Sequence, residues 1–124
     1  MQHRDAIILQ KIISEIEKSF IFFGDNTLED FLDNEILQYA VGMISINIGE
    51  LVKNLSDDFR KNNSQVAWKS AAQFRDIVAH KYETLRMVDV YKTVKEDFPE
   101  LKKQIEKILE NEQKSVRGGK NVDD

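Results

Sequence analysis

Hydrophobic residues recur at steps of three and four along most of the chain, which is the spacing of an amphipathic α-helix. Such a stripe predicts a long helix over residues 6–23, and Gly24 marks its end because glycine tolerates a left-handed backbone. The segment Thr27-Leu28-Glu29-Asp30 then predicts an N-cap and a short helix over 28–33. The first stripe consists of Ala6, Leu9, Ile13, Ile16, Phe20 and Phe23.

A second long helix is predicted over residues 35 to about 60, and it is apolar on two sides. A helix that is apolar over so much of its girth is expected to be central, with neighbours on more than one side. Gly42, Ser45 and Gly49 form a groove of small residues on its remaining side. Close packing of another helix explains these glycines better than a tolerated loss of helix propensity does. The two apolar stripes are Leu37, Val41, Ile44, Ile48, Leu51 and Leu55, and Tyr39, Met43 and Ile46 with Glu50.

A break at 62–64 precedes a third predicted helix over about 65–79, and residues 80–86 are ambiguous. A final periodic region runs from Met87 to Ile108 and keeps its phase through Pro99. Because proline suits the first turn of a helix, this region predicts two collinear helices with an interruption at 97–99. The fold class is therefore all-α: an antiparallel four-helix bundle with a short extra helix and a kink near Pro99. Residues 1–110 form the one domain, and 111–124 are expected to be a flexible tail because they lack periodicity.

Composition supports a folded domain and excludes several classes of protein. The chain has 124 residues, of which 41% are hydrophobic, so it can form a real core. With 0 Cys, disulfide scaffolds and thiol catalysis are excluded. No apolar run is long enough to span a membrane, and the N-terminus does not resemble a signal peptide, so a soluble cytoplasmic protein is expected.

Charge is unevenly distributed along the chain. The net charge is −4, but residues 60–86 hold six basic and two acidic residues, a local charge of +4. This polarity indicates either one anion-facing surface on an acidic body or simply an uneven solvated surface.

Most chemical signatures are absent, including glycine-rich phosphate loops and His-rich metal motifs, so neither a metal nor a cofactor is expected. The exception is an R-x4-H-x-Y pattern formed by Arg75, His80 and Tyr82. Arginine binds phosphate with forked hydrogen bonds and histidine transfers protons near neutral pH, which together suffice for RNA cleavage without a metal. Five residues span about 140° of an α-helix, so either the helix ends near Ala79 or a second chain completes the site. The alternative is structural: His80 would cap a helix end, Arg75 and Asp76 would form a surface pair, and Tyr82 would be core.

Several ordered segments resemble the HEPN superfamily, specifically the HepT-like toxins of HEPN/MNT toxin–antitoxin pairs. Besides R-x4-H-x-Y, the segment Ile48-Gly49-Glu50-Leu51 followed by Leu55-Ser56 resembles the family's I-G-E-A…L-S segment. Trp68, seven residues before Arg75, matches its W-x6-R pattern, and residues 93–101 resemble its closing helix. The similarity covers roughly residues 4–110.

The resemblance implies a homodimeric, metal-independent endoribonuclease toxin of a type VII-like pair. Arg75 and His80 would be its catalytic residues, in a cleft between protomers, acting on single-stranded or loop regions of RNA. The resemblance also implies a nucleotidyltransferase antitoxin of the MNT type that can transfer AMP to Tyr82. The added phosphodiester would block the cleft and repel RNA.

The chain departs from the family pattern at two positions. Asp76 stands where Asn is common, so it is a supporting residue that either orients Arg75 or His80 or lowers activity, and Lys81 stands where Gly is common. Asp76 favours the alternative function, a non-catalytic interaction module that binds or regulates a nucleotidyltransferase; a generic structural bundle is a third interpretation. Asn47 and Glu50 either support the site or are buried hydrogen-bonding groups, and the sequence assigns them no role.

Overall fold

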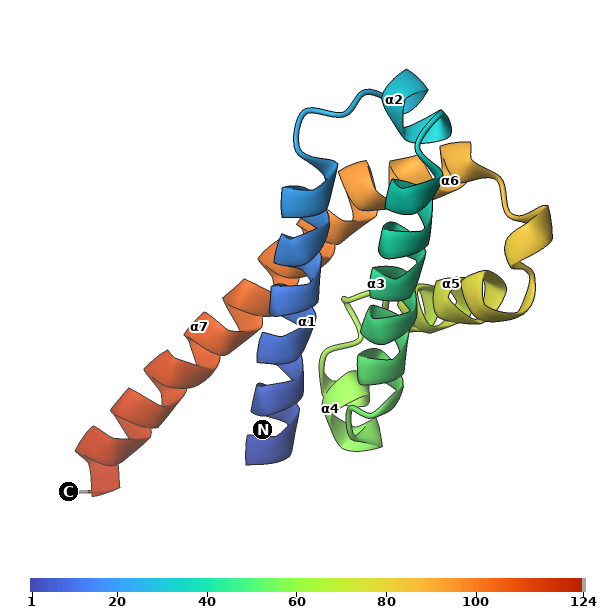
Figure 1. Cartoon of the computed structure of the whole chain (residues 1–124). Coiled ribbons are helices and arrows are strands. Elements are labelled where there is room, and N and C mark those ends of the chain that lie inside the picture. The colour runs from blue at the N-terminus through green and yellow to red at the C-terminus, as the bar shows by residue number, and fades with distance from the viewer. Residues whose placement is uncertain (124) are drawn as a thin grey trace.

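A computed structural model describes the backbone of residues 1–123 and the side chains of residues 1–113, and every regular element in it is helical (Figure 1). The all-α prediction is therefore confirmed for the part of the chain described. None of these helices combines the length and apolar character needed to cross a bilayer. The elements are α1 (His3–Phe23), α2 (Leu28–Leu32), α3 (Glu35–Lys53), α4 (Asp57–Asn62), α5 (Trp68–His80), the 3-10 turn η1 (Tyr82–Thr84), α6 (Met87–Lys92), the π-helical turn η2 (Thr93–Asp97) and α7 (Phe98–Asp123).

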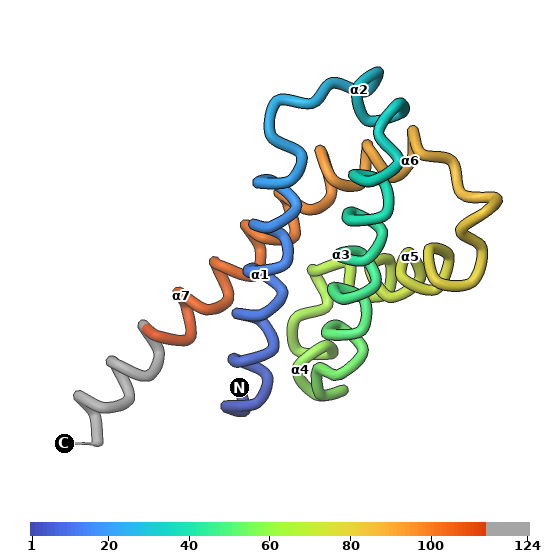
Figure 2. Tube along the Cα trace, in the orientation of Figure 1, coloured from blue at the N-terminus to red at the C-terminus, as the bar shows by residue number. Residues whose placement is uncertain are grey.

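Helix α3 lies at the centre of the fold. It packs against α1 on one side and α5 on the other, and α7 packs against α1. In Figure 1, α1 and α3 run in opposite directions and α5 lies across α3. After α5 the chain turns through η1 at the edge of the molecule and returns along α6 (Figure 2). The residues most completely buried in the core include Leu9, Ile12, Ile16, Val41, Ile48, Val52 and Ile105.

The two predicted signals between α1 and α2 are confirmed. Gly24 has a positive φ of 50°, and its N–H donates to the Phe20 carbonyl at 2.9 Å. The Thr27 hydroxyl accepts from the Asp30 N–H at 3.2 Å, and the Asp30 carboxylate accepts from the Thr27 N–H at 3.0 Å. This reciprocal pair satisfies two donors at the start of α2, which explains why so short a helix forms.

The predicted single helix over 35–60 is wrong in one respect: it is interrupted at residues 54–56. Helix α3 ends at Lys53, and a separate helix, α4, begins at Asp57. The break forms at Ser56, whose hydroxyl accepts from the Phe59 N–H at 3.2 Å and thereby caps α4. Buried Asp5 of α1 accepts from both the N–H and the hydroxyl of Ser56, at 2.9 and 2.8 Å. Asp5, near the N-terminus, thus stabilises the turn between α3 and α4.

Replacing Ser56 with alanine is expected to destabilise the protein by about 1–2 kcal/mol, because it removes a helix cap and leaves one oxygen of a buried carboxylate without its donor. Urea denaturation followed by circular dichroism measures this loss. The matched control is Ser64→Ala in the exposed loop before α5, where a change of less than about 0.5 kcal/mol is expected. Equal stability of the two variants would contradict this account of the turn.

The later helices begin at different residues from those predicted. Helix α5 starts at Trp68 rather than 65, because the Val66 N–H and the Trp68 indole N–H both donate to the Asn63 carbonyl, at 3.2 and 3.0 Å. The interruption expected at 97–99 is the π-helical turn over Thr93–Asp97, and Pro99 occupies the first turn of α7 as predicted. Helix α7 continues to Asp123 despite the missing periodicity after 110. The predicted flexible tail at 111–124 falls mostly on side chains outside those described and stays a prediction.

The small-residue groove of α3 is occupied by α5, as predicted. A Cβ atom added to Gly49 would lie 2.0 Å from the Arg75 Cβ and 3.0 Å from the Ala71 carbonyl oxygen. A Cβ added to Gly42 would lie 3.5 Å from the Tyr82 ring and 3.6 Å from Val78, which are ordinary contacts. The absence of a side chain at Gly49 therefore allows the close approach that places Arg75 against α3.

Candidate functional site

The R-x4-H-x-Y pattern lies at the end of α5 and in the turn that follows. Arg75 is in the middle of the helix, His80 is its last residue, and Tyr82 opens η1. His80 is still helical, and the Lys81 N–H donates to the Ile77 carbonyl at 2.8 Å. The rotation of about 140° between positions five apart on a helix therefore holds, and Arg75 and His80 point in different directions.

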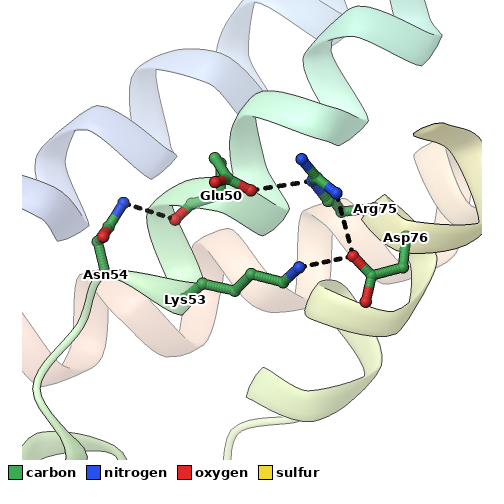
Figure 3. Close-up of polar contacts among 5 residues, drawn as sticks. All are labelled: Glu50, Lys53, Asn54, Arg75 and Asp76. Carbon is green, nitrogen blue, oxygen red and sulfur yellow. Dashed lines mark hydrogen bonds and ion pairs between the residues drawn. The ribbon is translucent and has the colours of Figure 1, made fainter. Parts of the chain in front are cut away.

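Arg75 is half-buried between two carboxylates (Figure 3). Its Nε lies 2.9 Å from the Glu50 Oε2 on α3, and its Nη1 donates to the Asp76 Oδ1 at 3.2 Å. The Glu50 contact is an ion pair without hydrogen-bond alignment, since Nε is buried and makes no hydrogen bond among the described residues. Guanidinium has five N–H groups, so the two acids orient Arg75 and still leave donors for a phosphate.

Asp76 contacts a second cation. Its Oδ1 accepts from the Lys53 Nζ at 2.6 Å as well as from Arg75 (Figure 3). The hydrogen bond from Lys53 is the main cause that lowers the pKa of the Asp76 carboxyl. Desolvation opposes it, and the hydrogen bond from Arg75 lowers the pKa further by a smaller amount. The prediction that Asp76 is a supporting residue is untested, but its contact with Arg75 places it beside that side chain rather than beside His80.

The lowered pKa of Asp76 predicts how this pair responds to pH. A carboxyl whose pKa is lower in the folded than in the unfolded protein stabilises the fold at pH values above its unfolded pKa. This stabilisation is lost as the pH falls through the folded pKa. We therefore expect the Asp76 carboxyl carbon to titrate by NMR below its usual value of 3.8. In Lys53→Gln the inflection should move back up toward that value. A wild-type inflection at or above the usual value would show that the ion pairs do not persist in solution.

Tyr82 packs against α3. Its ring stacks on the Tyr39 ring with centroids 5.0 Å apart, and its hydroxyl is buried without a hydrogen-bond partner among the described residues. Burial raises the pKa of this hydroxyl, with smaller contributions from Tyr39 and Glu35. Buried polar groups without partners are rare in folded proteins, so the surroundings of Tyr82 are a candidate place for a missing binding partner.

The expectation that α3 has neighbours on more than one side is confirmed, because both α1 and α5 pack against it, but its second apolar stripe is largely uncovered. Tyr39 and Met43 are each 58% exposed, and Ile36 on the same face is 83% exposed. Ile77 of α5 is also exposed. Positions 36, 39 and 43 follow one helix face, which continues to Glu50 and its ion pair with Arg75. This apolar face therefore ends at a charged cluster that consists of Glu50, Lys53, Arg75 and Asp76.

The two residues left open by the sequence are now placed. Asn47 donates to Glu15 of α1 at 2.6 Å, so it joins α1 to α3, whereas Glu50 pairs with Arg75. The ion pairs between α3 and α5 were not predicted, although Lys53 shares the helix side of Gly42 and Gly49 that the sequence assigns to a neighbouring helix. A cavity of about 440 Å³ lies between α5 and the η2–α7 segment, but neither Arg75 nor His80 lines it.

Comparison with known proteins gives a consistent result. The model of the family described as "Ribonuclease HepT-like" matches residues 9–108. A "Probable ribonuclease HepT" of Thermococcus cleftensis is 36% identical over 106 residues, which cover 86% of this chain and 94% of that protein. A "Putative RNase" of Caldanaerobacter subterraneus is 35% identical over 104 residues, covering 84% of this chain and 93% of that protein.

A longer relative carries the similarity in only part of its length. The "Gamma-glutamylcyclotransferase and putative RNase" of Methanocaldococcus jannaschii is 36% identical over 116 residues, which cover 94% of this chain. The chain spans about half of that relative, 52% of its length. No solved structure matches the chain.

Proposed function

Because this chain belongs to the HepT-like ribonuclease family of the HEPN superfamily, we propose that it is a metal-independent endoribonuclease, the toxin of a toxin–antitoxin pair. Arg75 and His80 are its catalytic residues, and they act in a cleft between two protomers. The observation that carries the proposal is the geometry of α5. Two carboxylates orient Arg75, while His80 points in a different direction from the same helix.

A second copy of the chain supplies the histidine that lies beside Arg75, because Arg75 and His80 of one copy face different directions. The exposed face of Ile36, Tyr39 and Met43 favours a partner of the same kind, because a two-fold axis pairs an apolar face with itself. The charged cluster at the end of this face then lies at the rim of the interface. Sedimentation of Met43→Glu, which places a charge in the apolar face, is expected to give a monomer where the wild type gives a dimer.

The reaction needs only proton transfer and charge neutralisation. The RNA 2′-oxygen loses its proton to His80 and forms a bond to phosphorus, while the bond from phosphorus to the 5′-oxygen breaks and that oxygen takes a proton from water. Arg75 offsets the charge that grows on the phosphate oxygens. The products are a 2′,3′-cyclic phosphate and a 5′-hydroxyl. Accessible single-stranded regions or loops suit this chemistry because the nucleotide must rotate for in-line attack.

The regulatory part of the proposal is transfer of AMP to Tyr82 by a nucleotidyltransferase antitoxin. The Tyr82 oxygen would bond to the α-phosphorus of ATP, pyrophosphate would leave, and the phenolic proton would be lost. Because this oxygen is buried, the ring must first leave its stack on Tyr39. Intact mass of the protein co-expressed with the nucleotidyltransferase should rise in units of AMP, and Tyr82→Phe should remain unmodified.

Cleavage of a single-stranded RNA in the presence of EDTA tests the central claim. The wild type is expected to cleave it and leave 2′,3′-cyclic phosphate ends, whereas His80→Ala purified identically is the control for contaminating nuclease. A folded dimer that binds its nucleotidyltransferase but cleaves no RNA would instead identify the chain as a non-catalytic interaction module.

A further inference from the structure

Lys53 is a cation at the candidate site that the R-x4-H-x-Y pattern does not include. It is the last residue of α3, and its Nζ binds the same carboxylate oxygen of Asp76 that Arg75 binds (Figure 3). Because both cations contact one atom, they lie next to each other across the α3–α5 boundary. The side chains of Lys53 and Asp76 are 37% and 49% exposed, so the pair is open to a ligand from solvent.

The Lys53–Asp76 pair contributes little to folding, because exposed ion pairs are screened by water and restrict two flexible side chains. Its consequence for charge is larger. The two carboxylates of Glu50 and Asp76 balance the two cations, so the cluster is neutral. Without Lys53, Arg75 would be the one cation beside two carboxylates, and the cluster would carry a net negative charge. Lys53 therefore removes the repulsion that Asp76, in place of a neutral residue, would exert on an incoming phosphate.

The chemistry of the two cations is also different. Arg75 is fixed by its two carboxylates, as a residue that must meet one phosphate in one geometry should be. The Lys53 ammonium has three donors on a flexible stem, and Asp76 uses one of them. The remaining donors can follow a neighbouring phosphate of a flexible strand.

We propose that Lys53 is a further phosphate-binding residue of this site, and that Asp76 is a positioning residue that keeps Lys53 and Arg75 side by side. Lys53 contacts the RNA backbone at the phosphate adjoining the one that reacts. This inference rests on the proposed function and names how its substrate is held. It accounts for Asp76 as part of the RNA-binding arrangement rather than as a defect in it.

Kinetics of Lys53→Gln test the proposal, with Lys107→Gln on α7 as a control for the loss of one positive charge. We expect Lys53→Gln to raise KM for a single-stranded RNA about fivefold to tenfold with little change in kcat, and to reduce the salt dependence of binding by about one phosphate contact. Lys53→Arg should restore most of the affinity, since it restores the charge. Lys107→Gln should leave both KM and the salt dependence within about twofold of wild type.

A binding measurement separates failure of this inference from failure of the proposed function. The probe is a fluorescent oligonucleotide whose 2′-hydroxyls are replaced by hydrogen, so that it cannot be cleaved. Weaker binding by Lys53→Gln than by Lys107→Gln supports the role of Lys53 even if the wild type cleaves no RNA. Equal KM values and equal oligonucleotide affinities for the two variants would overturn it, as would a wild type that binds no oligonucleotide.

Discussion

Replacing Gly49 with alanine is expected to destabilise the protein by about 2 kcal/mol and to reduce RNA cleavage at least tenfold, because the new methyl group collides with the base of the Arg75 side chain. The added Cβ would lie 2.0 Å from the Arg75 Cβ and 2.7 Å from its Cγ. The Arg75 Cβ is bonded directly to the α5 backbone, so no side-chain rotation can move it away. Helix α5 must therefore move away from α3, and Arg75 moves with it.

Two effects of the substitution oppose each other, and their sizes decide the sign. Alanine favours a helix over glycine by about 1 kcal/mol, whereas overpacking costs about 1–3 kcal/mol and more where neighbours cannot shift. Here α3 is also held by α1 on its other side, so it cannot retreat from α5 freely. The collision is expected to exceed the gain in helix propensity.

Gly42→Ala is the matched control on the same helix and against the same neighbour. Its Cβ would meet Tyr82 and Val78 at 3.5 and 3.6 Å, so only the propensity gain remains and a stabilisation of up to about 1 kcal/mol is expected. Urea denaturation of both variants measures the difference. If Gly49→Ala proves as stable as Gly42→Ala, the close contact between α3 and α5 does not exist in solution.

These two glycines also illustrate what a sequence predicts well. Small residues at steps of three and four on α3 indicate a close helix neighbour whatever its identity, and α5 fills that groove. Local signals such as the Thr27–Asp30 pair were equally reliable because both partners lie within one turn. The break at Ser56 was missed because hydrophobic spacing continues across it, while the group that fixes it, Asp5, is 51 positions away.

The candidate site shows the same limit. Arg75, His80 and Tyr82 could be chosen from their spacing and from chemistry. The contacts of Arg75 with Glu50, and of Asp76 with Lys53, depend on how α5 crosses α3, and that crossing is a tertiary property. The exposure of Tyr39 and Met43 has the opposite cause: a stripe pattern records that a face is apolar but not whether the same chain covers it.

The second large effect concerns the proposed catalytic residues, and it also tests whether two chains build the site. Arg75→Ala and His80→Ala are each expected to lower cleavage at least about 100-fold, since each removes a group that acts on charge or protons in the transition state. Circular dichroism should show both variants folded, because His80 is exposed and Arg75 is only half-buried.

Co-expression of the two inactive chains with different tags distinguishes assembly within a chain from assembly between chains. In a mixed dimer one chain retains His80 and the other retains Arg75, so one of two composite sites is intact only if the residues meet across the interface. With random pairing, recovery to about a quarter of wild-type activity is expected, because about half the dimers are mixed and each restores one site. Recovery should vanish when Met43→Glu is added to both chains, since that change removes the interface. Mixed dimers that form but stay inactive would place Arg75 and His80 in one chain's site and contradict the cleft inferred from α5.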